Sequence, residues 1–266
     1  MRSALTERSA RVAAAVKLHR HVGRRRAGLF LAEGPNLVEA ALRRGLVRDL
    51  YVTEDAARRH DELLAGQLAP VHVVTERAAK ALSDTVTPSG LIAVCQIPAT
   101  SLNDVLAGPP GLITVAVDIS EPGNAGTLIR IADAMGAAAV ILAGHSVDPF
   151  NGKCLRASTG SIFSIPVVVA PDALQVLTLL RTAGLQVLAT AVDGEISLDD
   201  ADPMLARPTA WLFGPEAQGL PDEVAAQADR RLRIPMAGGA ESLNVAAAAA
   251  ICMYQSARAL QLGQRT

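Results

Sequence analysis

The sequence predicts an α/β protein with a mostly parallel sheet, preceded by a smaller α/β domain. Over residues 112–260, short apolar stretches alternate with helical patterns, as expected for parallel strands covered by helices on both faces. Half of the 266 residues are apolar, but only four are Phe, two Tyr and one Trp, so the core must consist of small aliphatic side chains. Residues 98–111 have the Pro, Gly and polar composition of a linker. We therefore predict two domains, residues 1–105 and residues 106–266.

Each element is expected where apolar periodicity and the flanking Gly, Pro and polar residues indicate it. In the first domain we expect strands at 29–32, 50–53, 71–75 and 91–97, and helices at 36–44 and 56–64. In the second we expect strands at 112–118, 138–143, 165–169, 186–191, 210–213 and 232–234, and helices at 124–135, 152–158, 172–183, 222–228 and 242–260. The last helix begins almost entirely with alanine, which permits a close approach to another backbone. We expect this helix to be buried.

Sequence features argue against several classes of protein. No apolar signal stretch follows the first arginines, and the longest apolar stretch, residues 245–254, is about half of the ~20 residues that span a bilayer. We therefore expect a cytoplasmic protein without a membrane helix. The dinucleotide motif G-x-G-x-x-G, the phosphate loop G-x-x-x-x-G-K-[ST] and the zinc motif H-E-x-x-H are all missing from the sequence.

The three cysteines are expected to be small buried hydrophobic residues. Cys95, Cys154 and Cys252 lie far apart and form no C-x-x-C pair, so we expect neither a disulfide framework nor a structural zinc site. No metal is predicted.

The positive charge is concentrated at the N-terminal end of the chain. Residues 1–60 contain 13 Lys and Arg against 6 Asp and Glu, whereas the rest of the chain contains 12 against 20. Arg24, Arg25 and Arg26 are consecutive, a density suited to contacts with a phosphate backbone. We expect these three arginines to bind RNA; the alternative is a solvated helix face.

The first of three candidate loops, residues 121–136, follows an apolar strand and leads into a helix. Gly123 and Gly126 let the backbone approach a ligand closely, and the free N–H groups at a helix N-terminus favour an anion. Asn124 is either a functional residue or a plain helix N-cap. Arg130 lies on an otherwise apolar helix, so its guanidinium either reaches solvent or points at a phosphate or ribose.

The other two loops also follow strands, where ligands bind in parallel sheets. In residues 211–221, Glu216 stands among two glycines and two prolines, which presents a carboxylate beside backbone that can contact a ligand. The alternative for this loop is an ordinary surface turn. In residues 231–251, a Gly-Gly turn precedes the Ser-Leu-Asn sequence that opens the alanine-rich helix.

Three motifs occur in order in these loops. They are the N-x-G-x-x-x-R of residues 124–130, the F-G-P-E-x-x-G-L of residues 213–220, and the I-P-M-x-G-x-x-E-S-L-N-V-A of residues 234–246. Together, in this order and spacing, they resemble the signature motifs of the SpoU (TrmH) family of the SPOUT superfamily, which are RNA 2'-O-ribose methyltransferases. The resemblance implies S-adenosylmethionine as cofactor, a homodimer formed through the second domain, and a deep trefoil knot in the sheet, which is an exception to the rule that chains do not knot.

The resemblance also implies which residues form the site. The cofactor would be held mainly by backbone groups at Gly214, Ile234 and Leu243. In the family, the arginine of the first motif handles the 2'-hydroxyl proton; because arginine stays protonated at ordinary pH, we predict that it orients the hydroxyl and stabilises the developing alkoxide. The implied catalytic residues are Arg130, Asn124, Glu216, Ser242 and Asn244, and a less specific segment adds Arg156 and Ser158.

Residues 24–96 resemble, more loosely, the N-terminal RNA-binding domain of many family members, which shares its fold with some ribosomal proteins of the large subunit. The positive charge of residues 1–60 agrees with this resemblance. We therefore predict methylation of a ribose 2'-hydroxyl in large-subunit ribosomal RNA. Two alternatives stay open: a methyltransferase of the same superfamily that acts on tRNA or on a base, and a non-catalytic RNA-binding protein on the same scaffold.

Overall fold

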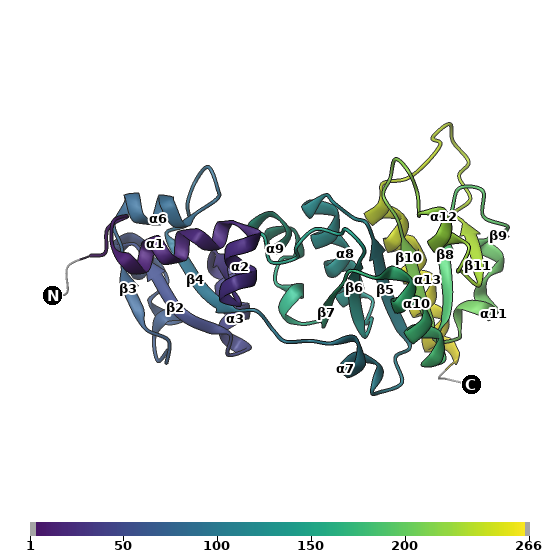
Figure 1. Ribbon diagram of the computed structural model, residues 1–266, viewed down its shortest axis with the longest axis horizontal. Coiled ribbons are helices and arrows are strands. Elements are labelled where there is room, and N and C mark those ends of the chain that lie inside the picture. Colours follow the sequence, from purple (N-terminus) through teal and green to yellow (C-terminus); the bar gives the residue numbers. More distant parts are fainter. Residues whose placement is uncertain (1–3, 264–266) are drawn as a thin grey trace. The chain divides into compact units, whose positions relative to one another are not determined.

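The computed structural model describes residues 4–263 and divides them into two units (Figure 1). The first unit comprises the described residues up to Ala99 together with Phe150–Phe163. The second comprises Thr100–Pro149 and the described residues from Ser164 onward. The segment Phe150–Phe163 therefore packs with the N-terminal part of the chain, whereas the predicted boundary at residue 105 placed it in the second domain.

The first unit contains a four-stranded mixed sheet. Its strand order is β1-β4-β2-β3, with β4 antiparallel to β1 and β2, and β3 parallel to β2. The strands are β1 (Leu29–Glu33), β2 (Val47–Val52), β3 (Val71–Val73) and β4 (Leu91–Gln96). The helices are α1 (Ala10–Val16), η1 (Lys17–His19), α2 (His21–Ala27), α3 (Pro35–Arg43), α4 (Glu54–Arg59), α5 (Asp61–Leu64), α6 (Glu76–Leu82), α9 (Gly152–Ser158) and η2 (Ser161–Phe163). The four strands predicted for this part of the chain are confirmed.

Aromatic packing explains why Phe150–Phe163 belongs to the first unit. The ring of Phe30, in β1, is fully buried and lies 4.9 Å from the ring of Phe150 and 6.0 Å from that of Phe163, measured between centroids. In a chain with four phenylalanines, three therefore pack in one place. Burying such rings is among the largest single contributions to a core.

A tight turn between η1 and α2 makes Arg24 a structural residue. Its side chain is buried, and its Nη1 donates hydrogen bonds to the carbonyl oxygens of Leu18 and His19, both at 2.9 Å. The turn needs glycine at position 23, because a Cβ atom there would overlap the carbonyl of Lys17. The expectation that Arg24 contacts RNA as part of an exposed basic run is therefore corrected, because its guanidinium is buried and holds this turn.

The second unit contains a seven-stranded sheet in which all neighbouring strands are parallel. Its order is β7-β6-β5-β10-β8-β11-β9. The strands are β5 (Leu112–Val117), β6 (Ala139–Ala143), β7 (Val167–Ala170), β8 (Gln186–Thr190), β9 (Ile196–Ser197), β10 (Thr209–Phe213) and β11 (Arg230–Arg233). The helices are α7 (Leu102–Leu106), α8 (Pro122–Ala134), α10 (Ala173–Thr182), η3 (Leu198–Asp200), α11 (Asp202–Leu205), α12 (Asp222–Ala225) and α13 (Val245–Gly263). The predicted α/β class with a mostly parallel sheet is confirmed, and the trefoil knot stays a prediction.

Helices cover both faces of this sheet. Ile113 and Val115 of β5 pack in one core with Leu177 of α10. The alternate residue Thr114 points to the other face, where its hydroxyl donates to the sulfur of Met253 in α13. Because successive residues of a strand point to opposite faces, a strand covered on both sides is buried throughout and almost entirely apolar, as β5 is.

Two sequence-based expectations differ from the structure. The stretch expected to be a linker contains α7, which begins with a capping box between Ser101 and Asp104, and its Leu102 packs into the core. Helix α13 is only half buried: Ala249 and Met253 are fully buried, whereas Tyr254 is 57% exposed. A surface helix buries one stripe of side chains, and alanine content alone did not show that the other stripe faces out.

The prediction that the three cysteines are small buried residues is confirmed, since Cys95, Cys154 and Cys252 are all buried. Desolvation by burial raises the pKa of Cys95 above its usual range and raises the pKa of Cys252 to about 12. No helix in residues 4–263 is long and apolar enough to cross a membrane.

Candidate active site

Strand order brings two of the candidate loops together. Strand β5 pairs in parallel with β10, in a register that places Phe213 opposite Ala116. Both strands therefore end at the same edge of the sheet, and the loops that follow them start side by side. The chain runs from β5 outward to β6 and β7, then returns to strands on the other side of β5. Such a switch in direction is where open parallel sheets bind ligands.

Asn124, Glu216 and Asn244, one residue from each loop, form a hydrogen-bonded cluster. The Nδ2 of Asn124 donates to Oε1 of Glu216 at 2.8 Å. The Nδ2 of Asn244 donates to the same carboxylate oxygen and, at 3.3 Å, to Oδ1 of Asn124. The backbone N–H of Val245 also points to this oxygen, at 3.4 Å. One carboxylate thus holds three loops in a fixed relation, which is what an active site built from separate segments requires.

Helix capping explains the position of Asn244 but not that of Asn124. Asn244 precedes α13, and its Oδ1 accepts the backbone N–H of Ala246 at 2.9 Å. Helix α8 begins with Pro122, and Glu121 is its N-cap residue. Asn124 therefore lies inside the helix, and the alternative that it is a plain N-cap is wrong.

A cavity of about 140 Å³ lies beside this cluster. It is lined by five of the residues singled out from the sequence, namely Gly214, Glu216, Ile234, Ser242 and Leu243. Sequence reasoning missed the lining residues Thr190–Val192, at and after the end of β8, and did not single out Met236 within the third motif. The position of Thr190–Val192 after a predicted parallel strand was a usable signal, but no motif marked it.

Gly214 is required by a close backbone approach. A Cβ atom at this position would lie 2.6 Å from the backbone N of Leu220 and 2.7 Å from the carbonyl carbon and oxygen of Gly219. These are main-chain atoms, which cannot rotate away as a side chain can. The loop after β10 therefore folds back on itself at Gly214 and forms one wall of the cavity.

Arg130 lies apart from the polar cluster within this chain. It is exposed, it does not line the cavity, and it makes no hydrogen bond or ion pair with any residue in 4–263. Six residues separate it from Asn124, which in an α-helix is about 9 Å along the axis and roughly 120° around it. Asn124 and Arg130 therefore point from different sides of α8.

Arg156 and Ser158 belong to the first unit and not to this cavity. Arg156 forms an ion pair with Asp84. Ser158 is buried, and its hydroxyl donates to the carbonyl of Leu155 at 2.8 Å. Arg25 and Arg26, also in the first unit, are both exposed.

The strands of the parallel sheet in the second unit end at a cavity and a polar cluster. This arrangement defines an α/β domain that binds a small molecule. Comparison with protein families identifies this domain. The SpoU rRNA Methylase family matches residues 111–254, and the MRM3-like substrate binding domain matches residues 9–93. The chain belongs to the SpoU rRNA methylase family, and the family predicted from the motifs is confirmed.

Two relatives and one solved structure are similar over most of the chain. The 23S rRNA (guanosine(2553)-2'-O)-methyltransferase RlmP of Bacillus subtilis (strain 168) is 36% identical over 90% of this chain and 92% of the relative. The 23S rRNA (uridine(2479)-2'-O)-methyltransferase of Streptomyces viridochromogenes is 34% identical over 88% and 84%. The SpoU methyltransferase AviRb from Streptomyces viridochromogenes, in complex with the cofactor AdoMet, superposes with a TM-score of 0.86 at 32% identity and covers 94% of this chain and 98% of that one.

Proposed function

We propose that this protein transfers a methyl group from S-adenosylmethionine to a ribose 2'-hydroxyl of large-subunit ribosomal RNA. The observation that carries the proposal is the cluster of Asn124, Glu216 and Asn244, which joins the three family motifs beside a cavity lined by residues of the second and third motifs. Family membership confirms the predicted class of enzyme, an S-adenosylmethionine-dependent RNA 2'-O-methyltransferase.

The lining of the cavity suits the cofactor by its apolar walls and by its charge. Ile234, Met236 and Leu243 supply apolar walls of the kind that accept a flat heterocycle, and the fold at Gly214 exposes backbone to it. The carboxylate of Glu216 lines the same cavity and has the sign that stabilises a positively charged ligand. When bound there, S-adenosylmethionine supplies the methyl group.

The remaining residues position the RNA hydroxyl. Methyl transfer to an oxygen is an in-line displacement, so most of the catalysis comes from alignment and from stabilising the charge that develops on that oxygen. Asn124 and Asn244 hold the loops through Glu216, and Ser242 borders the cavity. Arg130, exposed and without an internal partner in residues 4–263, is the donor that orients the ribose oxygen.

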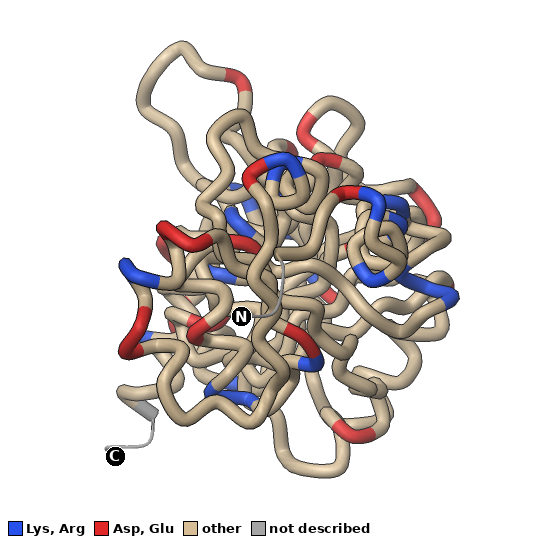
Figure 2. Tube along the Cα trace, turned by 90° about the vertical axis from the view of Figure 1, so that its left-hand side faces the viewer, with Lys and Arg blue, Asp and Glu red and all other residues tan. Residues whose placement is uncertain are grey.

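Charge and domain content favour ribosomal RNA over the alternatives. The first unit contains 17 Lys and Arg against 10 Asp and Glu, whereas the second contains 8 against 16, so the first unit must attract the polyanion. Figure 2 shows these basic positions interspersed with acidic ones. The two relatives described above are named as 23S rRNA methyltransferases, and each is similar to this chain over at least 84% of its own length. The complete set of motif residues argues against a non-catalytic protein.

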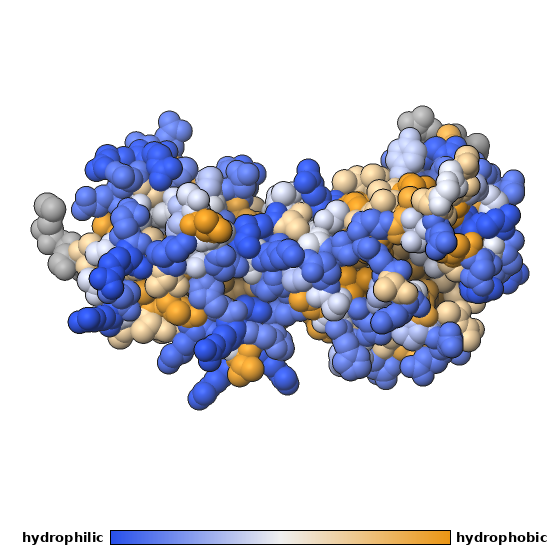
Figure 3. Space-filling view, turned by 90° about the horizontal axis from the view of Figure 1, so that it is seen from above, coloured by the Kyte–Doolittle hydropathy of each residue, from blue (hydrophilic) through white to orange (hydrophobic). Residues whose placement is uncertain are grey.

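The exposed face of α13 supports a homodimer formed through the second unit. Ala247, Ile251 and Tyr254 are exposed and lie at spacings of four and three residues, which places them on one stripe of the helix. On the face of the molecule shown in Figure 3, hydrophobic residues are interspersed with hydrophilic ones. We place the protein in the cytoplasm, where its RNA substrate is made. Light scattering of Tyr254→Glu should show monomers, and a dimer unchanged in mass would contradict the assignment of this helix.

Two measurements test the function. Calorimetric titration with S-adenosylmethionine should give one site per chain, and RNA from a strain lacking the gene should lack one 2'-O-methyl group, restored by the purified enzyme. Loss of a methyl group in tRNA instead would select the tRNA alternative. Absence of cofactor binding would select the non-catalytic one.

A further inference from the structure

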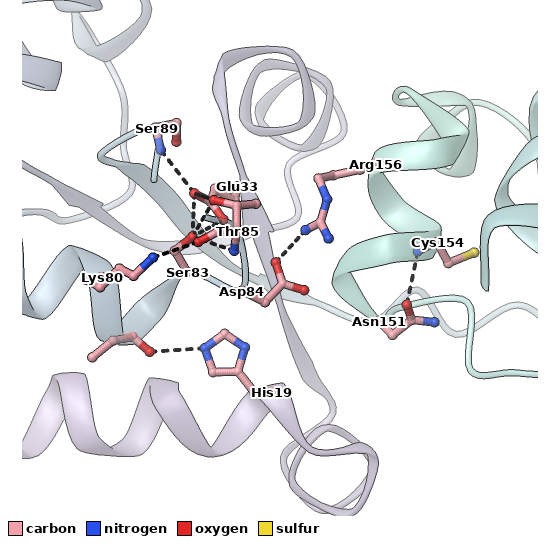
Figure 4. Close-up of polar contacts among 11 residues, drawn as sticks. His19, Glu33, Lys80, Ser83, Asp84, Thr85, Ser89, Asn151, Cys154 and Arg156 are labelled. Carbon is pink, nitrogen blue, oxygen red and sulfur yellow. Dashed lines mark hydrogen bonds and ion pairs between the residues drawn. The ribbon is translucent and has the colours of Figure 1, made fainter. Parts of the chain in front are cut away.

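A cavity of about 280 Å³ lies within the first unit, between η1, β1, α6 and α9 (Figure 4). Phe150 and Leu155 are buried residues of its lining. His19, Lys153 and Arg156 line it as well and are exposed. The cavity therefore combines an apolar interior, which includes an aromatic ring, with basic groups at its opening.

Asp84 fixes the direction of Arg156. The two side chains form an ion pair and remain 39% and 38% exposed. The carboxylate of Asp84 also lies against Gly152, where a Cβ atom would overlap it. One carboxylate cannot saturate the five N–H donors of a guanidinium, so Arg156 keeps donors for a further acceptor.

The second acid of the lining is held by hydrogen bonds from within the unit. The Glu33 carboxylate accepts hydrogen bonds from the hydroxyl of Ser83 at 2.8 Å and from the backbone N–H of Ser89 at 3.1 Å, and Thr85 donates to it at 3.3 Å (Figure 4). These donors orient the carboxylate but leave its charge. The ionised side chains of the lining are Arg24, Lys153 and Arg156 against Glu33 and Asp84, so positive charge is in excess.

We propose that this cavity binds one unpaired nucleotide of the RNA, an inference that rests on the proposed function. Single-stranded RNA is recognised when a base leaves its stack and lies against aromatic or apolar side chains. The volume is near the lower end of the ~300–1,000 Å³ of small-ligand sites, which suits one nucleotide. The base enters against the ring of Phe150, and its phosphate lies on Arg156 at the opening. A duplex keeps its bases stacked and does not enter.

Two variants test the base and the phosphate separately. Ala81, on α6, lines the cavity, so Ala81→Phe fills it; Ala57→Phe, on α4 and outside this lining, is its control. Arg156→Gln removes the phosphate contact; Arg58→Gln removes the same charge from an exposed ion pair with Asp55 and is its control. Binding of a short, fluorescently labelled single-stranded RNA and of the duplex of the same sequence is measured by anisotropy over a salt series.

We expect Ala81→Phe to weaken single-strand binding roughly 5- to 150-fold, the loss of one stacked base, with an unchanged salt slope and unchanged duplex binding. Arg156→Gln should lower the slope of log affinity against log salt by about 0.7, and Arg58→Gln should not. Equal effects of the two glutamine variants, or wild-type binding by Ala81→Phe, would overturn the pocket.

Circular dichroism shows whether Ala81→Phe folds. If it does not, Arg156→Gln and photo-cross-linking of 5-bromouridine RNA decide: cross-links within residues 150–156 support the cavity, and cross-links confined to other segments refute it. Methylation of 23S rRNA by the wild-type enzyme tests the proposed function independently. If the wild-type enzyme methylates 23S rRNA and the variants bind RNA as the wild type does, the nucleotide pocket is overturned and the proposed function is not.

Discussion

Gly214→Ala should weaken cofactor binding, although it adds only one methyl group. The added Cβ would lie 2.6–2.7 Å from backbone atoms of Gly219 and Leu220, well inside van der Waals contact, so the loop that lines the cavity must shift. Overpacking of this kind costs about 1–3 kcal/mol. If the loss falls on the cofactor-bound conformation, the Kd for S-adenosylmethionine rises roughly 5- to 150-fold.

The control for this prediction is Gly238→Ala. Gly238 lies in a loop of the same unit, and its added Cβ would meet no atom within 4 Å. Calorimetric titration of both variants, with thermal unfolding to separate affinity from stability, measures the difference. Gly214→Ala with wild-type affinity and wild-type melting temperature would refute the reasoning that this backbone contact shapes the cavity.

Arg130→Ala should lower the rate of methyl transfer by about 100-fold or more, which is the usual loss when a charge-stabilising donor is removed. The affinity for the cofactor should be unchanged, because Arg130 does not line the cavity. A weakened affinity in calorimetry would contradict this prediction. The double variant Arg25→Gln/Arg26→Gln should lower the salt slope of RNA binding by about 0.7 for each lost phosphate contact, and an unaltered slope would make these arginines a solubilising surface. Cys252, fully buried and with its pKa raised to about 12 by desolvation, should resist iodoacetamide at pH 8 until the protein unfolds, as mass spectrometry can check. The hydrogen bond from the backbone N–H of Arg231 lowers the pKa of Glu195. The ionised Glu195 therefore stabilises the fold above the ordinary pKa of Glu, and this stabilisation is lost as the pH falls through the lowered pKa. The melting temperature of Glu195→Gln should depend less on pH in the acid range, and an unchanged pH profile would count against this prediction.

Local patterns were sufficient for the longer elements of the second unit. The buried stretch of β5 and the helical pattern of α10 depend on side chains close together in the chain, which the sequence displays directly. The motifs also identified most of the cavity lining, because a glycine needed for a close approach, such as Gly214, is visible as a residue type. The run of three arginines did not show that Arg24 turns inward, because its acceptors are supplied by the turn that the folded chain makes at residues 18–19.

Long-range pairing was decided by the tertiary structure alone. Asn124 and Glu216 are 92 residues apart and meet because β10 adds beside β5, a choice of neighbour that depends on the packing of the whole sheet. The placement of Phe150–Phe163 with the first unit depends likewise on a partner, Phe30, more than a hundred residues away. The sequence determined which residues carry the chemistry, since that depends on their types and spacing. Which of these residues contact one another depends on the free energy of burying distant surfaces together, and those contacts are determined only when the whole chain folds.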